Sequence, residues 1–200
     1  MTHKGTVTIE TPRLILRRFT ADDAEAMYNN WANDPQVTKY LTWQPHADAS
    51  VTRQLLELWS ANYENPAYYQ WAIVLKELGQ PIGSISVVSM RDIINQVEIG
   101  YCIGKKWWHQ GITSEAFAAV IPFLFEEVGA NRIAAKHDPN NPHSGAVMRR
   151  CGLTHEGTVR QTGLNNTGLC DLCIWGILRS DYDKMKAQAD NTASKAKSKL

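Results

Sequence analysis

The stretch from Gln96 to Val128 joins a strand pattern, a glycine turn and the longest apolar helix pattern of the chain without interruption. QVEIGYCIG reads as a strand, KKWWHQG is a polar turn, and ITSEAFAAVIPFLFEEV is helix-forming and stops at Gly129. Gly111 therefore falls where the helix begins, with no side chain to obstruct approach to the main chain. A chain organised around this unit is expected to contain a sheet with helices packed on it.

The start of this helix is a candidate anion site. About four N–H groups lack a partner at a helix N-terminus, and the helix dipole adds about half a positive charge. A phosphate group satisfies both, provided that the backbone is accessible, as Gly111 allows. Lys105 and Lys106 bring positive charge nearby, or they form an ordinary solvated turn. From the glycine alone, an anion site and simple relief of a tight turn both remain open.

The rest of the chain divides into short strands and helices, with no internal repeat and no clear interdomain linker. A strand or strand pair comes first and is interrupted by Pro12. Helices are then expected over 21–32, 34–40 and 47–63, strands over 71–76, 82–90, 97–104 and 132–137, a helix over 144–151, and a final strand pair over 153–160 and 170–178. This order predicts an α+β fold with a mixed, mostly antiparallel central sheet flanked by helices.

Length and composition are those of an ordinary globular domain. With 200 residues, 44% apolar and 20% charged, the chain suits one domain, expected over residues 1–186, with a disordered tail at 187–200. The net charge of +1 gives no support for nucleic acid or an anionic membrane as a partner. No apolar run approaches the roughly 20 residues of a membrane span, and the N-terminus lacks a signal-like apolar core, so a cytoplasmic protein is expected.

The cysteines are expected to be free thiols. Cys170 and Cys173 form a C-x-x-C pattern, which occurs in metal and redox sites. They lie in a strand pattern, however, and residues three apart in a strand point to opposite faces. Cys102 and Cys151 do not form a second ligand pair. No metal is therefore expected, and reduced thiols in the cytoplasm are the simpler interpretation.

The turn WWHQGITSEA resembles the acyl-CoA loop of the GNAT superfamily of N-acetyltransferases, usually written Q/R-x-x-G-x-G/A. Aligned on Gly111, Trp108 takes the first position and Thr113 the last, where the family has Gly or Ala. The tryptophan and the following SEA look like the RimJ/RimL-like branch. ETPRLILRRFTADDAEAMY, VEIGYCI and HDPNNPHSGAVMRRCGLTHEGTVR are similar to further family segments in the same order, so the resemblance covers about residues 8–185.

The resemblance implies a GNAT-type sheet with acyl-CoA in the gap between the family's fourth and fifth strands, and acetyl-CoA as co-substrate. The main chain near Ile103 would pair with the pantetheine arm. Asn141 would anchor the pantetheine amide, unless it caps a helix. The residues implied in cofactor binding are Ile103, Trp108, His109, Gln110, Gly111, Ile112, Thr113, Ser114, Asn141 and Ser144.

Glu98 is the candidate general base, acting through water. Direct attack by an amine requires loss of its proton, and a positioned base contributes about 10²- to 10⁴-fold to such a step. Glu98 lies in an otherwise apolar strand and matches the glutamate of the family's E-I-G-Y segment. The alternative is a glutamate paired with a lysine, because alternation does not tell which face it occupies. His109 and Asp92 are weaker candidates.

Ser144 is the candidate partner of the leaving thiolate. Many superfamily members use a tyrosine seven residues after the motif asparagine. Counted from Asn141, that position here is Met148, which has no proton to give. Ser144 lies four residues before Met148 on the same helix face, and resembles the serine of RimL-like members. The alternative is that Ser144 only caps the helix.

The acceptor site is expected between the first two helices with their loop and the last hairpin. Its candidate residues are Asp34, Tyr40, Trp43 and His46, although a helix cap at Asp34 and simple packing of the rings are equally open. The resemblance implies transfer to a primary amine, either a protein N-terminal α-amine or a small-molecule amine. A non-catalytic acyl-CoA-binding sensor or interaction module is the alternative. Homodimers are common in the family, so a homodimer is a further expectation.

Overall fold

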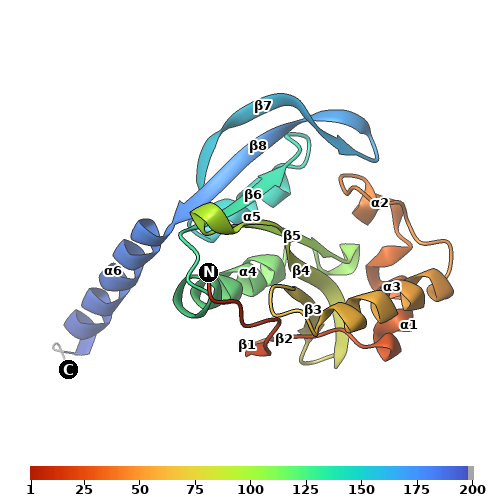
Figure 1. Ribbon diagram of the computed structural model, residues 1–200, viewed down its shortest axis with the longest axis horizontal. Helices are drawn as coiled ribbons and strands as arrows, with labels where there is room; N and C mark the ends of the chain where they lie inside the picture. The colour runs from red at the N-terminus through yellow and green to blue at the C-terminus, as the bar shows by residue number, and fades with distance from the viewer. Residues whose placement is uncertain (198–200) are drawn as a thin grey trace.

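The structure is a computed structural model that describes residues 1–197, with the side chains of the last helix described through residue 191. Its centre is an eight-stranded sheet in the order β1-β2-β3-β4-β5-β6-β8-β7 (Figure 1). The strands are β1 (Ile9–Glu10), β2 (Leu14–Arg17), β3 (Gln70–Leu75), β4 (Gln80–Arg91), β5 (Gln96–Ile103), β6 (Arg132–His137), β7 (Thr154–Asn165) and β8 (Gly168–Leu178). Every neighbouring pair is antiparallel except β5 and β6, which run parallel.

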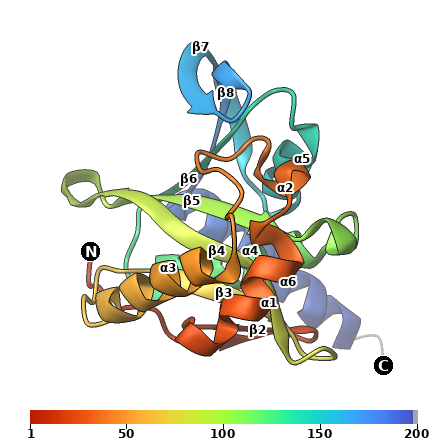
Figure 2. The same cartoon turned by 90° about the vertical axis from the view of Figure 1, so that its right-hand side faces the viewer.

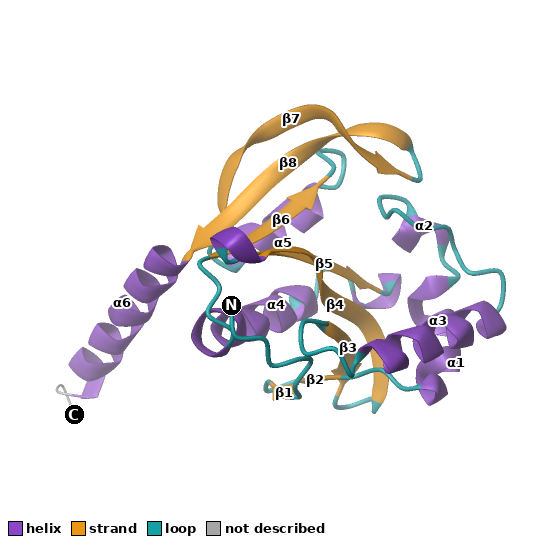
Figure 3. Cartoon of the chain, in the orientation of Figure 1, coloured by secondary structure: helices purple, strands orange, loops and turns teal. Residues whose placement is uncertain are grey.

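Helices cover both faces of the sheet (Figures 2 and 3). The α-helices are α1 (Ala24–Met27), α2 (Pro35–Thr38), α3 (Ala49–Asn62), α4 (Ile112–Pro122), α5 (Pro142–Arg150) and α6 (Arg179–Lys197). Short 3-10 or π turns are η1 (Ala21–Asp23), η2 (Tyr28–Ala32), η3 (Asp92–Ile94), η4 (Lys105–Trp107) and η5 (Phe123–Glu127). In Figure 2, α1 and α3 lie in front of the sheet and α4 lies behind it. The predicted α+β class with a mostly antiparallel sheet is confirmed.

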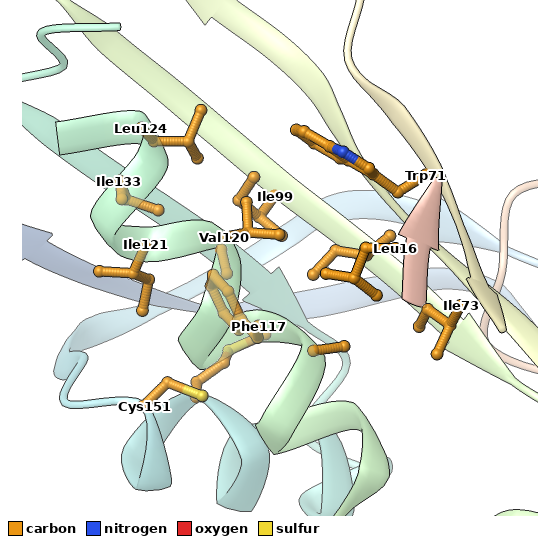
Figure 4. Packing of buried hydrophobic residues seen from close by; sticks show 14 of the residues in the cluster. Leu16, Trp71, Ile73, Ile99, Phe117, Val120, Ile121, Leu124, Ile133 and Cys151 are labelled. Carbon is orange, nitrogen blue, oxygen red and sulfur yellow. The ribbon is translucent and has the colours of Figure 1, made fainter. Parts of the chain in front are cut away.

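The main core lies between the sheet and α4 (Figure 4). Phe117 and Val120 of α4 recur at helical spacing and are fully buried. They pack in one cluster with Ile99 of β5 and Ile133 of β6. A second cluster, which includes Trp31, Leu56 and Ala72, lies on the face covered by α1 and α3. The two clusters hold the sheet rigidly between helices, which fixes where its strand ends lie.

The parallel pair β5 and β6 separates partway along its length. The two strands pair only from Gln96 with Arg132 to Ile99 with Ala135. Beyond Ile99, β5 continues to Ile103 against β4, whereas β6 turns away along β8. Main-chain groups over residues 100–103 therefore have no β6 partner on that edge. The pair corresponds to the fourth and fifth strands of the predicted sheet, because Pro12 divides the first strand into β1 and β2.

Three boundaries differ from the sequence predictions. The helix expected over 21–32 is divided into η1, α1 and η2. α5 begins at Pro142 rather than at residue 144, because proline suits the first turn of a helix. The last hairpin is longer than expected, since Gly163 and Leu164 pair with Cys170 and Leu169 in the ladder instead of forming a loop.

The tail expected to be disordered over residues 187–200 is helical in the part that the structure describes. α6 runs through Lys197 and projects away from the sheet (Figure 1), and residues 198–200 lie outside the described residues. Its first turns are anchored, because Arg179 donates to the Phe125 carbonyl and both Tyr182 and Lys186 bond the Glu126 carboxylate. Alanine, lysine and glutamine favour helix, so the helix continues from this anchored start.

Candidate active site

A cavity of about 450 Å³ opens beside the separated ends of β5 and β6, with α4, α5 and the loop before α4 in its walls. All the predicted cofactor residues except Gln110 line it: Ile103, Trp108, His109, Gly111, Ile112, Thr113, Ser114, Asn141 and Ser144. Sequence reasoning missed further lining residues: Val37, Leu41, Tyr101, Cys102, Trp107, His143, Ala146, Val147 and Arg150. The structure thus brings the glycine turn and the start of α5 into one site.

Gly111 adopts a backbone conformation that favours glycine. Its φ is +72°, at the N-cap position of α4, and His109 two residues earlier also has a positive φ of +60°. The first helical bond that closes on this residue runs from the Glu115 N–H to the Gly111 carbonyl at 3.0 Å. The N–H groups of residues 112–114 therefore lack an intrahelical acceptor, as expected at a helix start. Both the turn and the accessible main chain require glycine here.

Two arginines from distant segments flank Gly111. A Cβ atom built on this glycine would lie 3.8 Å from Arg13 Nη2 and 4.0 Å from Arg150 Nη1. Lys105 and Lys106, which the sequence offered as the local positive charge, do not line the cavity, and Lys106 lies over the Trp107 ring. The helix N-terminus and two guanidinium groups together fit a diphosphate.

Glu115 fixes the glycine turn to the N-terminal hairpin. Its carboxylate accepts from Thr11 Oγ1 at 2.6 Å and from Arg13 Nε at 2.6 Å, while Arg13 Nη1 donates to the Gln110 carbonyl at 3.1 Å. Burial disfavours the charged carboxylate, but these hydrogen bonds outweigh burial and lower the pKa of Glu115. The glutamate of the SEA segment therefore holds the turn and positions Arg13 beside Gly111.

Trp108 joins the same turn to the end of β5. Its indole N–H donates to the Ile103 carbonyl at 3.0 Å, so this carbonyl already has one partner. Gln110 points elsewhere: its side-chain amide donates to the Lys106 carbonyl at 2.9 Å, which is why Gln110 does not line the cavity. The tryptophan at the first motif position thus has a structural role, and binding through the main chain at Ile103 stays a prediction.

Ser144 lies in the cavity wall and is not a helix cap. The N-cap position of α5 is Asn141, and its side chain makes no capping hydrogen bond. Ser144 is the third residue of α5 and contacts the Tyr101 hydroxyl at 3.1 Å. Met148, one turn later, is 1% exposed and belongs to the core. The cap alternatives for both Ser144 and Asn141 are therefore excluded, which leaves their polar groups available to the cavity.

Glu98 lies outside the cavity wall. Its Oε2 is 2.8 Å from Lys136 Nζ on the neighbouring strand β6, and its side chain is 17% exposed. The parallel register explains the pair, since Glu98 lies opposite Ala134 and Lys136 is the next residue on the same face. The structure therefore contains the pairing of Glu98 with a lysine that the sequence left open. The role of Glu98 as general base stays a prediction.

The structure brings only Tyr40 of the four candidate acceptor residues to the cavity. Asp34 caps α2 by accepting from the Gln36 N–H at 2.8 Å. Trp43 packs against His46 with ring centroids 5.3 Å apart. His46 Nδ1 lies 2.8 Å from Thr52 Oγ1, and burial lowers the pKa of this histidine. Asp34 therefore acts as a helix cap, and Trp43 and His46 pack against each other, as the alternatives to an acceptor site describe.

The tip of the last hairpin is fastened to the segment after α2. Asn166 donates from Nδ2 to the carbonyls of Thr38 and Trp43, at 2.9 and 2.7 Å, and from its main chain to the Leu41 carbonyl at 3.2 Å. The approach of the β7–β8 hairpin to α2 is visible in Figure 1. The two segments expected to form the acceptor site therefore meet, and Tyr40 and Leu41 between these contacts line the cavity.

The missed lining residues carried few sequence signals. His143 is exposed but also lines the cavity, with its ring centroid 4.5 Å from that of His109. Arg150 forms no ion pair with any described residue. It follows the predicted residue Ser144 and then Val147 at helical spacing, and that spacing is the signal that would have found it. Tyr101 was read as part of an apolar strand, and only its phenol hydroxyl hinted at a polar partner.

The described residues contain no group of three or more His, Cys, Asp or Glu side chains placed to hold a metal ion. The thiols of Cys102, Cys151, Cys170 and Cys173 are all free. Within residues 1–197, no helix has the length and apolar character that crossing a membrane requires.

The chain is similar to known acetyltransferases over most of its length. The profile of the acetyltransferase (GNAT) domain matches residues 13–154. The uncharacterized N-acetyltransferase p20 of Bacillus licheniformis is 29% identical over 175 residues, which are 88% of this chain and 98% of that protein. The ribosomal protein uS5 alanine N-acetyltransferase of Escherichia coli is 25% identical over 160 residues, 77% of this chain and 81% of that enzyme.

A solved structure has the same fold. The ribosomal L7/L12 alpha-N-protein acetyltransferase RimL, in complex with coenzyme A, superposes with a TM-score of 0.77 at 21% identity and covers 86% of this chain and 98% of that chain. The protein is thus an acetyltransferase by class. It belongs to the GNAT family, and the predicted RimJ/RimL-like resemblance is confirmed by its similarity to an enzyme named as a ribosomal-protein N-acetyltransferase.

Proposed function

We propose that this protein transfers the acetyl group of acetyl-CoA to a primary amine by direct attack of the amine on the thioester. The observation that carries the proposal is the meeting of three features in one cavity: the glycine turn, the β5 edge left open over residues 100–103, and Ser144. The turn would hold the diphosphate, and the open edge would pair with the pantetheine amides. Main-chain N–H groups at that edge would stabilise the oxyanion.

We propose further that the acceptor is an α-amine rather than a lysine-like alkyl amine. The bases among the described residues that line the cavity are His109 and His143, and none is a carboxylate. Imidazole and carboxylate groups are both weaker bases than an amine, so the neutral fraction of the amine limits the rate. At pH 7.5 this fraction is about a quarter for an α-amine of pKa about 8, and about a thousandth for an alkyl amine of pKa about 10.4. The uS5 alanine N-acetyltransferase of Escherichia coli, whose name specifies alanine, supports the same class of acceptor.

Two matched peptides test both parts of the proposal. One peptide has a free N-terminal alanine and an acetylated lysine, and the other has an acetylated N-terminus and a free lysine. Release of CoA thiol at pH 7.5 should be at least about 100-fold faster with the first peptide. A polyamine extends the test to small amines. Binding of acetyl-CoA with no thiol release from any amine would contradict catalysis, and a preference for the free lysine would contradict the acceptor class.

The single domain over residues 1–186, the cytoplasmic location and the homodimer stay predictions. So do the catalytic role of Glu98 and the contacts of individual residues with acetyl-CoA.

A further inference from the structure

The hydroxyl of Tyr101 contacts Ser144 at two points. It donates to the Ser144 main-chain carbonyl at 3.0 Å, and it lies 3.1 Å from Ser144 Oγ. Tyr101 comes from the part of β5 beyond the last β6 pairing, and Ser144 comes from the first turn of α5. The contact therefore joins two walls of the cavity that are far apart in sequence. Both residues line the cavity.

We propose that Tyr101 is the positioning residue that directs the Ser144 hydroxyl toward the sulfur of acetyl-CoA, which rests on the function proposed above. The carbonyl to which Tyr101 donates is the one that the Met148 N–H would bond in a regular helix. Met148 itself is buried and apolar. A tyrosine hydroxyl from β5 therefore lies at the turn of α5 that carries Ser144.

The proton count explains how Tyr101 acts. A tyrosine and a serine hydroxyl each carry one proton and accept through the oxygen. When Tyr101 donates to Ser144 Oγ, the serine oxygen has its partner and the serine proton is free to face the sulfur. When Tyr101 donates only to the carbonyl, Ser144 can donate back to the phenol oxygen. Tyr101 thus holds Ser144 Oγ in place in both arrangements, and the first is the one that leaves the serine proton free for the sulfur.

Burial keeps Tyr101 a donor. It raises the pKa of the phenol far above its ordinary value, although the hydrogen bond with Ser144 opposes this shift. The ring lies 5.7 Å from that of Phe117 on α4, so its position is fixed by packing as well as by the hydroxyl. Tyr101 stays protonated throughout the range in which an amine acetyltransferase works.

The chemical step balances without proton transfer from Tyr101. The amine nitrogen forms a bond to the thioester carbon, and the C–S bond then breaks with its electron pair going to sulfur. The Ser144 hydroxyl donates a hydrogen bond to this thiolate. The proton lost by the amine nitrogen goes to solvent, and solvent returns one to sulfur, which gives an amide and CoA thiol.

A double-mutant cycle tests the positioning role. Tyr101→Phe retains the ring against Phe117 and removes only the hydroxyl. With the free N-terminal peptide, it should lower kcat about tenfold and change the KM for acetyl-CoA less than about twofold, as expected for one hydrogen bond to a charged group. Ser144→Ala should give a similar loss, and the double variant should be no slower than Ser144→Ala alone. Tyr182→Phe on α6, which loses the hydroxyl bond to Glu126 of η5, is the matched control and should retain kcat.

The outcomes separate the positioning role from its alternatives. Losses that multiply in the double variant, or an effect of Tyr101→Phe on KM alone, would overturn the coupling between Tyr101 and Ser144. If Tyr101→Phe does not fold, Ser144→Ala tests the contact from the other side, and an unchanged kcat overturns it. Normal turnover by Tyr101→Phe would overturn the positioning role and leave the proposed function intact. Absence of thiol release by the unmodified protein would overturn both.

Discussion

Glu98 of β5 and Lys136 of β6 form an ion pair of 2.8 Å across the parallel part of the sheet, just before the two strands separate. The pair lies next to the proposed site for acetyl transfer, but neither residue lines the cavity. Glu98 can therefore act as a base only through an intervening water, or its role is confined to the sheet. These two roles differ in how activity depends on pH.

Replacement of each partner in turn separates the two roles. If Glu98 is the base, Glu98→Gln should lower turnover about 100-fold at pH 6.5, and the deficit should shrink toward pH 9, where the amine loses its proton unaided. Lys136→Gln breaks the same ion pair but leaves the carboxylate, so it should stay within about fivefold of the unmodified protein. Steady-state rates across this pH range are the measurement. A parallel pH profile for Glu98→Gln would remove it as the base.

Gly111→Val should abolish binding of acetyl-CoA while the sheet stays folded. The new side chain would fill the approach to the helix N-terminus between Arg13 and Arg150. Gly79→Val is the matched control, because Gly79 has a φ of +68°, close to the +72° of Gly111, and a Cβ there would meet nothing within 4 Å. Both variants carry similar backbone strain. Calorimetric titration with acetyl-CoA distinguishes them, and equal affinities would contradict an anion site at Gly111.

The Glu115 carboxylate should contribute stability that depends on pH. Its pKa is lower in the folded chain than its ordinary value of 4.5, so the contribution is present above pH 4.5 and is lost as the pH falls through the folded pKa. Glu115→Gln should therefore cost about 1 to 3 kcal/mol at pH 7 and progressively less below pH 4.5. Thermal unfolding at several pH values is the measurement. Glu57→Gln, which replaces an exposed carboxylate of α3, is the control. If the difference in unfolding free energy between the unmodified protein and Glu115→Gln does not shrink in acid, the ionised Glu115 carboxylate does not anchor the turn.

Asn166→Ala should loosen the segment after α2 without affecting acetyl-CoA. The change removes the side-chain bonds to Thr38 and Trp43 and the one that Asn166 Oδ1 accepts from Gln44, and it leaves only the main-chain bond to Leu41. Amide hydrogen exchange over residues 38–44 should become at least about tenfold faster, and the KM for the amine should rise. Thr167→Ala is the control, because its hydroxyl bonds only Asn165 within the same hairpin. Unchanged exchange would show that other contacts hold this segment.

The order of elements was predictable because it depends on local patterns. Alternation along β5, helical spacing in α4 and the turn residues near Gly111 are all features of short windows. Pro12 correctly marked the division between β1 and β2. The helix α6 was not predicted, because it grows from an anchor on Phe125 and Glu126, which no local window contains.

The site was predictable only where one segment forms it. The glycine turn was found from its own residues and its resemblance to a family loop. Arg13 and Arg150 were not found, because they reach Gly111 through the fold, from the turn before β2 and from α5. Lys136 beside Glu98 depends on the parallel register, and the contact of Tyr101 with Ser144 spans 43 positions. Such pairs require the tertiary structure.

A crystal structure with bound acetyl-CoA is the most direct test of the proposed site. The diphosphate should lie against the main chain of residues 109–114 with the guanidinium groups of Arg13 and Arg150 beside it, and the thioester should lie between the open β5 edge and Ser144. Coenzyme bound elsewhere, or a glycine turn filled by the protein's own side chains, would contradict acetyl transfer in this cavity.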